Sequence, residues 1–374
     1  MKHSVLIHFL ILLGSLVGAY LVWTREPTGL EDEIPIFNMR GSLDKILFSA
    51  DDRRVEIHKH KENGESYVWL EVTTYEVPPK DKVPPAASVK DSKEKAGESL
   101  PVDKGKEAKA TISEPTPKKV PKTKQFLGNK EVLDLMEQLS KLSAVRSLGL
   151  VASDKLKEYG LSDKKKVLTL VSGATPRVFI IGSTTYGNMD TYLQDKADGR
   201  VYVVRPKYLE GIQYAEYRFM ERDPFGIDPT EIDRITVTAE GKSKSILQQN
   251  KRDPAAIFWA DENSPTKKNE LYKTWTNNLL RLRVSEYFAR EEKSSGEKQR
   301  LKVEFFRGEK SLGSVTLFER ANQATLPLAL PNDKQPPAGT VEYLVFSTHT
   351  RSNAKVVNTL AEEILRDLPA ILTK

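Results

Sequence analysis

Two glycines, Gly182 and Gly187, bracket a run of hydroxyl side chains in the stretch "IGSTTYGN" and raise the question of a phosphate-binding loop. Such a loop needs a lysine after the second glycine and a helix whose N-terminal amides face the anion. Asn188 follows Gly187 here, and the residues on both sides are typical of strands. The sequence therefore predicts a turn between strands, followed by a hairpin at Asp198-Gly199.

Histidines are the next candidates for chemistry. His58 and His60 lie two residues apart on a predicted strand, so both side chains point to one face. Two imidazoles could begin a metal site, but lysines flank them and the sequence places no nearby carboxylate to complete it. Motifs of the HExxH and GxSxG types are absent, and the chain has no cysteine, which removes disulfides and thiolate chemistry. We therefore expect surface histidines, with no catalytic, cofactor-binding or metal-binding residue and no cofactor.

A group of six tyrosines and two arginines could instead line a sugar- or peptide-binding face. Most of these tyrosines have the spacing of strand residues, so packing at sheet edges explains them equally well. The group consists of Tyr186, Tyr192, Tyr202, Tyr208, Tyr214 and Tyr217, with Arg205 and Arg218.

The N-terminal segment has the length and composition of a membrane-spanning helix. Val5 to Trp23 is a run of 19 residues without Asp, Glu, Lys or Arg, which nearly matches a hydrocarbon core of about 30 Å. Tyr20 and Trp23 suit the membrane interface, and the run ends without the small residues of a signal-peptide cleavage site. The sequence predicts an uncleaved transmembrane anchor over residues 1–24, with a cleaved signal peptide as the alternative.

The charges that flank this segment favour one orientation only weakly, because Lys2 on one side is balanced by Arg25 on the other. We expect a single-pass protein of the inner, cytoplasmic membrane, with its C-terminal bulk in the periplasm. Gly14 and Gly18 form a GxxxG pattern, on which two such helices can pack closely as a homodimer.

A low-complexity stretch of Pro, Lys, Glu, Ala and Ser occupies residues 77–124 and contains no aromatic residue. It cannot bury enough apolar surface to offset the entropy of ordering it, so we predict a disordered insert. Much of the net charge of +6 is concentrated there. The excess therefore indicates a solvated segment, or a tether to an anionic surface, and gives no reason to expect nucleic-acid binding.

An internal repeat becomes visible once this insert is removed. Asp44-Lys45-Ile46 aligns with Asp233-Arg234-Ile235, and Trp69 aligns with Trp259. Each copy begins with alternating apolar and polar residues, continues with one helical pattern, "NKEVLDLMEQLSKL" or "NELYKTWTNNLLRL", and returns to strands. A final helix is predicted from Ser352 onward.

This order of elements predicts an α+β fold, because strands and helices do not alternate one for one. We expect two tandem related modules of mostly antiparallel sheet with one main helix each, preceded by the single transmembrane helix. The first module covers residues 36–220, including the insert, and the second covers residues 228–374.

The stretch from Leu156 to Ile212 resembles the domain of unknown function 4340 (DUF4340) family. The resemblance rests on "EYGL" at Glu158 to Leu161, on "IIG" followed by Thr184, Gly187 and Tyr192, and on "VYVV". It implies an inner-membrane anchor and an envelope-facing repeat module, in a family often associated with ABC-type export or gliding-motility components. It implies an accessory role, and no functional residue carries over from it.

We therefore expect a non-catalytic envelope protein whose ectodomain contacts a protein partner, with ABC-type transporter subunits as the candidates. One alternative is a module that binds a glycan or polyanion through the lysine-rich insert and the tyrosines. The other is a hydrolase whose paired carboxylates cannot be recognised in sequence.

Overall fold

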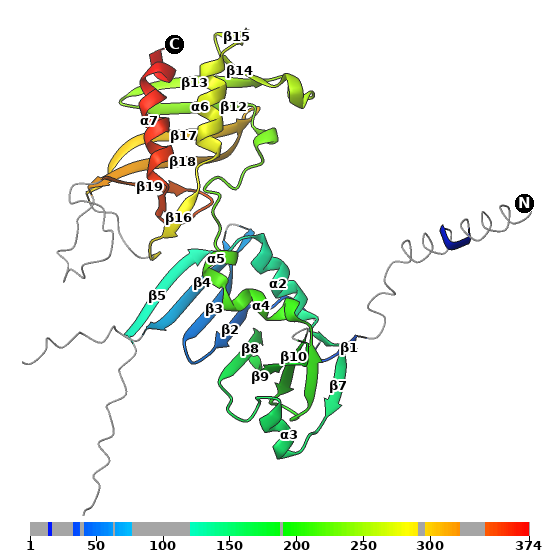
Figure 1. The fold of residues 1–374 in the computed structure, drawn as a ribbon. Helices are drawn as coiled ribbons and strands as arrows, with labels where there is room; N and C mark the ends of the chain where they lie inside the picture. Colours follow the sequence, from blue (N-terminus) through cyan, green and yellow to red (C-terminus); the bar gives the residue numbers. More distant parts are fainter. Residues whose placement is uncertain are drawn as a thin grey trace, which may run out of the picture.

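The chain folds into two nine-stranded sheets that follow one another along the sequence (Figure 1). The computed structural model describes residues 14–16, 33–37, 41–62, 64–76, 120–187, 190–290, 296–321 and 341–373. Every strand pair in these residues is antiparallel, as expected from the sequence. A small two-stranded pair, β1 (Ile34–Pro35) and β6 (Ser143–Ala144), lies beside the first sheet.

The first sheet has the strand order β5-β4-β3-β2-β8-β9-β10-β11-β7. Its strands are β2 (Lys45–Ser49), β3 (Arg53–Glu62), β4 (Glu65–Glu76), β5 (Val120–Leu127), β7 (Arg146–Gly149), β8 (Lys166–Ser172), β9 (Thr175–Thr184), β10 (Thr191–Asp195) and β11 (Val201–Val204). Its helical segments are α2 (Lys130–Ser140), α3 (Ser153–Glu158), η1 (Pro206–Tyr208), α4 (Glu210–Gln213) and α5 (Ala215–Arg218).

The second sheet has the order β15-β14-β13-β12-β17-β18-β19-β20-β16. Its strands are β12 (Arg234–Ala239), β13 (Lys242–Gln249), β14 (Phe258–Asp261), β15 (Ser264–Lys268), β16 (Val284–Tyr287), β17 (Lys298–Arg307), β18 (Lys310–Ala321), β19 (Val341–Ser347) and β20 (Ala354–Val356). Its helical segments are η2 (Pro229–Glu231), η3 (Pro254–Ala256), α6 (Glu270–Leu280) and α7 (Asn358–Thr373).

The two strand orders are the same when the strands are matched in sequence order, which confirms the predicted repeat. The match extends to single hydrogen bonds at the aligned aspartates. The carboxylate of Asp44 accepts a hydrogen bond from the N–H of Gly173 at 2.7 Å, and that of Asp233 accepts one from Gly308 at 2.6 Å. Both glycines have positive φ, +60° and +56°, a turn conformation that glycine adopts without steric cost.

The alignment of the two tryptophans is wrong by one residue. Strand pairing places Trp69 opposite His58, which lies opposite Lys45, whereas the matching row of the second sheet runs from Arg234 through Leu247 to Ala260. Trp259 therefore occupies the position of Val68. Because successive strand residues point to opposite faces, the two tryptophans lie on opposite faces of their sheets.

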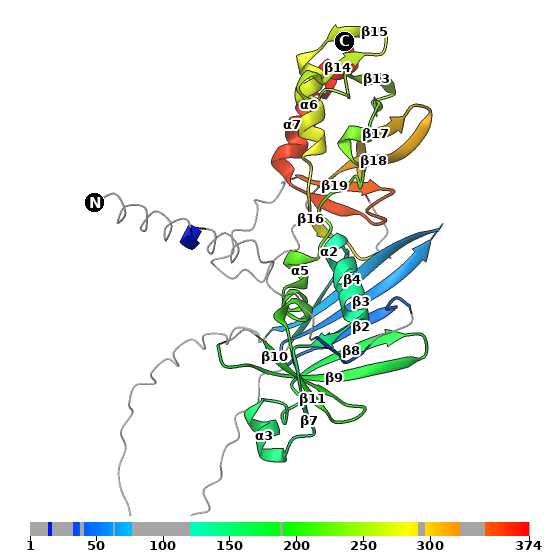
Figure 2. The same cartoon turned by 90° about the vertical axis from the view of Figure 1, so that its right-hand side faces the viewer.

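Helices cover one face of each sheet, and a hydrophobic core fills the space beneath them (Figures 1 and 2). The two predicted main helices are confirmed as α2 and α6. They begin after Asn129 and Asn269, and the Asn269 side chain accepts a hydrogen bond from the N–H of Leu271. Helix α7 packs beside α6, where the indole N–H of the buried Trp275 donates to the backbone oxygen of Ile364 at 3.0 Å.

The final helix begins later than the sequence indicated, at Asn358 instead of near Ser352. The intervening Ala354–Val356 forms β20, which pairs with β16 and β19. Pairing on both sides satisfies the backbone of this short segment and overrides its helical pattern.

The predicted insert is shorter than expected at its C-terminal end. Val120 to Lys124, which the composition assigned to a disordered stretch, are the first residues of β5 and pair with β4. The edge of a sheet tolerates Pro and Lys because the outer side of the strand faces solvent. Residues 77–119 lie outside the described residues.

The predicted anchor, Val5 to Trp23, lies outside the described residues except for positions 14–16. In the part of the chain that the structure describes, no helix combines the length and the apolar character needed to cross a bilayer.

Candidate functional site

The loop with the two glycines is a turn between β9 and β10, as predicted. Gly182 itself lies in β9, where a Cβ atom would approach the backbone oxygen of Tyr159 to 2.2 Å. The same oxygen accepts a hydrogen bond from the N–H of Ser183 at 2.8 Å. The glycine is therefore required for close backbone packing.

The "EYGL" motif is the other half of this contact. Tyr159 stacks on Tyr192 of β10 with ring centroids 4.2 Å apart, Gly160 has a φ of +67°, and Leu161 is buried. These residues dock α3 and the turn after it onto β9 and β10. The motif residues on which the family resemblance rests thus have a structural role.

The two histidines share one face, as predicted, with ring centroids 6.2 Å apart. His58 lies 3.2 Å from the Glu56 carboxylate, and His60 stacks on Tyr67. Burial lowers the pKa of His60, and the positive charge of Arg290 lowers it further. No group of three or more His, Asp and Glu side chains suited to a metal ion occurs within the described residues.

The group of tyrosines does not form one binding face. Tyr202 and Tyr208 are buried, and Tyr192 is stacked on Tyr159, whereas Tyr186, Tyr214 and Tyr217 are exposed. The two arginines of the group, however, line the same cavity.

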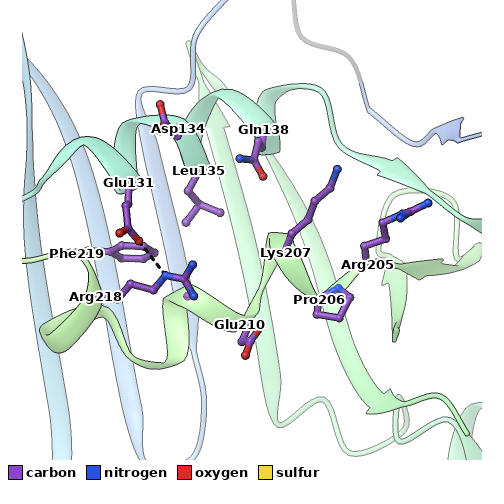
Figure 3. Close-up of a pocket in the computed structure, with 11 residues that line it drawn as sticks. Glu131, Asp134, Leu135, Gln138, Arg205, Pro206, Lys207, Glu210, Arg218 and Phe219 are labelled. Carbon is purple, nitrogen blue, oxygen red and sulfur yellow. Dashed lines mark hydrogen bonds and ion pairs between the residues drawn. The ribbon is translucent and has the colours of Figure 1, made fainter. Parts of the chain in front are cut away.

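This cavity has a volume of about 600 Å³ and lies between α2 and the segment from Arg205 to Phe219 (Figure 3). Leu135 and Phe219 supply an apolar lining. At one end, the Arg218 guanidinium forms an ion pair with Glu131 at 3.0 Å. The Asn129 side chain donates to the backbone oxygen of Arg218 at 2.8 Å, and this bond fixes the segment against the start of α2.

The other end of the cavity carries two cations. The Nε atom of Arg205 lies 3.0 Å from Glu33, and the Nζ atom of Lys207 lies 4.0 Å from the same carboxylate oxygen. Figure 3 shows Lys207 and Gln138 at this end, and the carboxylates Asp134 and Glu210 also line the cavity. Arg205, Lys207 and Arg218 thus each lie beside a carboxylate and remain partly exposed.

A second region with specific side-chain contacts is the junction between the two modules. Trp69 is only 7 % exposed, although it lies on the face of the first sheet opposite α2. Its ring meets Tyr287 of β16 edge-on, with centroids 6.0 Å apart. The Tyr287 hydroxyl donates to the backbone oxygen of Glu221, in the segment that joins the modules.

Charged groups surround this aromatic contact. Arg351 donates to Glu62 at 3.1 Å and to Glu65 at 2.9 Å, and its guanidinium lies 4.3 Å from the centroid of the Tyr67 ring. Arg290 lies over the rings of Tyr67 and Trp69. Residues that are far apart in sequence thus join the two modules by aromatic, cation–π and ionic contacts.

The connecting segment is bonded to both sheets. The N–H of Glu221 donates to Leu127 at the end of β5, and the oxygen of Arg222 accepts from Val284 of β16. Burial disfavours the charged form of Glu221, but His349, 3.8 Å away, and the N–H of Asp223 outweigh this and lower its pKa. Burial raises the pKa of the Tyr287 phenol, so it stays protonated as a donor.

Sequence reasoning missed this junction, although one signal was present. Tyr67 to Leu70 are four consecutive large apolar or aromatic residues in a strand, which indicates burial on both faces. The positions of Arg290 and Arg351 in loops gave no comparable signal.

Comparison with known families gives one match, which covers the middle of the chain. Residues 127–302 match the model of the domain of unknown function (DUF4340). This match confirms the resemblance to the DUF4340 family that the sequence indicated. The DUF4340 match begins at the end of β5 and ends in β17, so it includes α2, the cavity beside α2 and the segment that joins the modules. No curated protein and no solved structure matches the chain.

Proposed function

We propose that this DUF4340 protein is a non-catalytic accessory component of an ABC-type transport or gliding-motility-like system. In this proposal the N-terminal segment anchors it once in the inner membrane, and the two modules project into the periplasm to contact protein subunits of that system.

The observation that carries the proposal is the junction between the modules. One cluster of buried apolar residues extends through both modules, and Trp69, Tyr287 and Arg351 join them across the junction. A rigid pair of sheets presents surfaces at fixed separations, as a protein that positions partners requires. The apolar run from Val5 to Trp23 supports the anchoring part of the proposal.

The test is isolation of the tagged full chain from detergent-solubilised membranes at native expression. The proposal expects an ATPase and a permease subunit to be recovered with it in fixed proportion. A Trp69→Ala variant should reduce that recovery, while Trp259→Phe, a conservative change in the core of the second module, should not. Recovery of the chain alone from intact membranes would contradict the proposal.

A further inference from the structure

His60 lies at the junction between the two modules, although it belongs to the first one. It stands opposite Tyr67 in the pairing of β3 with β4, and the two rings stack with centroids 5.3 Å apart. The guanidinium carbons of Arg351 and Arg290, from the second module, lie 4.3 and 5.6 Å from the centroid of the same ring. A side chain that titrates near neutral pH thus shares an aromatic neighbour with two permanent cations of the other module.

The charges at this point are balanced only while His60 is neutral. Glu62 and Glu65 lie where β3 ends and β4 begins, and they are the carboxylates that bind the two arginines. Arg351 donates to Glu62 at 3.1 Å and to Glu65 at 2.9 Å, and Arg290 lies 3.7 Å from Glu62. A proton on His60 adds a third positive charge to two cations whose two carboxylate partners are already engaged.

His58 provides a comparison on the same face of the strand. Its ring centroid lies 6.2 Å from that of His60, but its Nε2 atom is 3.2 Å from the Glu56 carboxylate. Glu56 also binds Lys45 and Arg54, so its charge is already matched inside the first module. A proton on His58 therefore contacts a carboxylate of its own module, whereas a proton on His60 faces the arginines of the other.

The pKa of His60 depends on whether the junction is closed. Burial lowers this pKa, and the positive charges of Arg290 and His58 lower it further, against a smaller opposite effect of Glu62. Arg290 exerts its effect only while the two modules are in contact. The open form therefore takes up a proton more readily than the closed form, and the closed form loses stability as the pH falls below the ordinary histidine value of 6.5.

We propose that the junction is an acid-sensitive hinge, in which a proton on His60 repels Arg290 and Arg351 and releases the two modules from their fixed arrangement. The inference concerns the junction alone and requires neither the membrane anchor nor a partner. His349 acts in the opposite direction, because its Nε2 atom lies 3.8 Å from Glu221 of the connecting segment and a proton strengthens that pair. The repulsion at His60 must exceed this contribution for acid to open the junction.

Distances between spin labels at Lys166→Cys in β8 and Lys242→Cys in β13 report the arrangement of the modules, because the chain has no cysteine of its own. The labelled full chain is compared in detergent at about pH 7.5 and about pH 5.5, on either side of the histidine range. We expect the fraction of molecules outside the narrow distance peak to rise about threefold or more in acid, and to fall again when the pH is restored. A peak that stays narrow at both pH values would overturn the inference and leave the rigid junction intact, whereas a broad distribution at both would contradict the two together.

Three histidine variants assign the response to one side chain. His60→Gln keeps a planar side chain that cannot ionise and should abolish the response to pH, whereas the matched variant His58→Gln should keep it. His349→Gln removes the opposing pair and should enlarge the response. A response that survives His60→Gln, or that disappears in His349→Gln, would assign the effect to another group and contradict the inference.

A change on the other side of the junction tests the repulsion if His60→Gln does not fold, which circular dichroism at the higher pH would reveal. Arg290→Gln removes one of the repelled cations and leaves His60 in place. We expect it to reduce the response to acid. An undiminished response in Arg290→Gln would show that repulsion between His60 and the second module is not the cause.

Discussion

The two modules share a strand order and a main helix but differ in what lies beside that helix. In the second module, the 16-residue helix α7 packs against α6, and Trp275 bonds to its backbone. In the first module, the equivalent segment after β11 is divided into η1, α4 and α5, and a cavity of about 600 Å³ lies between it and α2. In the second module this position belongs to a closed core, whereas in the first module it is a cavity lined by charged side chains of both signs.

The tryptophans show a second difference of the same kind. Trp259 belongs to the helix-covered core of its sheet, and Trp69, one strand position away in the shared register, faces the neighbouring module. A shift of one residue in a strand moves a side chain to the opposite face. The comparison indicates that the two copies kept the same fold. They differ in the uncovered face of the sheet and in the helical segment that follows the last strand, which make different contacts in each copy.

The largest expected effect is in the closed core of the second module. Trp275→Ala removes a fully buried side chain and leaves the Ile364 oxygen without its donor. We expect a loss of about 3–5 kcal/mol in the free energy of unfolding. Denaturant titration followed by circular dichroism measures it. Leu135→Ala, at the equivalent position of α2 beside the cavity, should cost less, and an equal or greater cost would contradict the comparison.

The next effect concerns the junction. Trp69→Ala removes the contact with Tyr287 and should lower the free energy of unfolding by about 2–4 kcal/mol. It should also separate the unfolding of the two modules and increase proteolysis in the connecting segment 221–228. Trp259→Ala is the matched control, because it should destabilise the second module without exposing that segment. Equal cleavage in both variants would show that the face of the tryptophan does not matter.

A smaller effect is expected for Arg351. Its pairs with Glu62 and Glu65 are partly exposed, so Arg351→Met should cost only about 1 kcal/mol, including the loss of the contact with Tyr67. The difference in the free energy of unfolding between the wild-type protein and Arg351→Met should shrink as salt increases, because salt screens the ion pairs. Denaturant titrations at low and high salt test it, with Arg351→Lys as the charge-preserving control. A salt-independent difference would rule out an ionic contribution.

The smallest effect is expected for two carboxylates, one in each module, that each pair with two cations. Glu56 pairs with Lys45 and Arg54, and Glu342 pairs with Arg320 and Lys355. Burial opposes ionisation of both, but their cationic partners outweigh it, and both pKa values lie below the usual value of 4.5. A lowered pKa in the folded state stabilises the protein above about pH 4.5, and this stability is lost as the pH falls through the folded-state pKa.

Glu56→Gln and Glu342→Gln should therefore each cost about 0.5–1 kcal/mol at pH 7 and less at pH 3. Unfolding titrations over this pH range measure the change. A cost that is the same at pH 3 and pH 7 would show that charge is not the source of either contribution.

The sequence was sufficient to predict the repeat, the antiparallel sheets and both main helices, because alternating and helical patterns report directly which residues face a core. It could not predict the register of Trp69, since a one-residue offset between two aligned strands leaves the pattern almost unchanged. The strand from Val120 was missed because Pro and Lys at a sheet edge resemble a solvated linker. The cavity and the junction depend on residues brought together from distant segments, such as Glu33 with Arg205 and Glu62 with Arg351.

The central claim is that two copies of one fold are held together as a rigid pair. Double electron–electron resonance between spin labels at Lys166→Cys in β8 and Lys242→Cys in β13 tests it most directly, because the chain contains no other cysteine. The account predicts one narrow distance distribution, which broadens in the Trp69→Ala variant. A broad distribution in the otherwise unaltered chain, unchanged by Trp69→Ala, would contradict it.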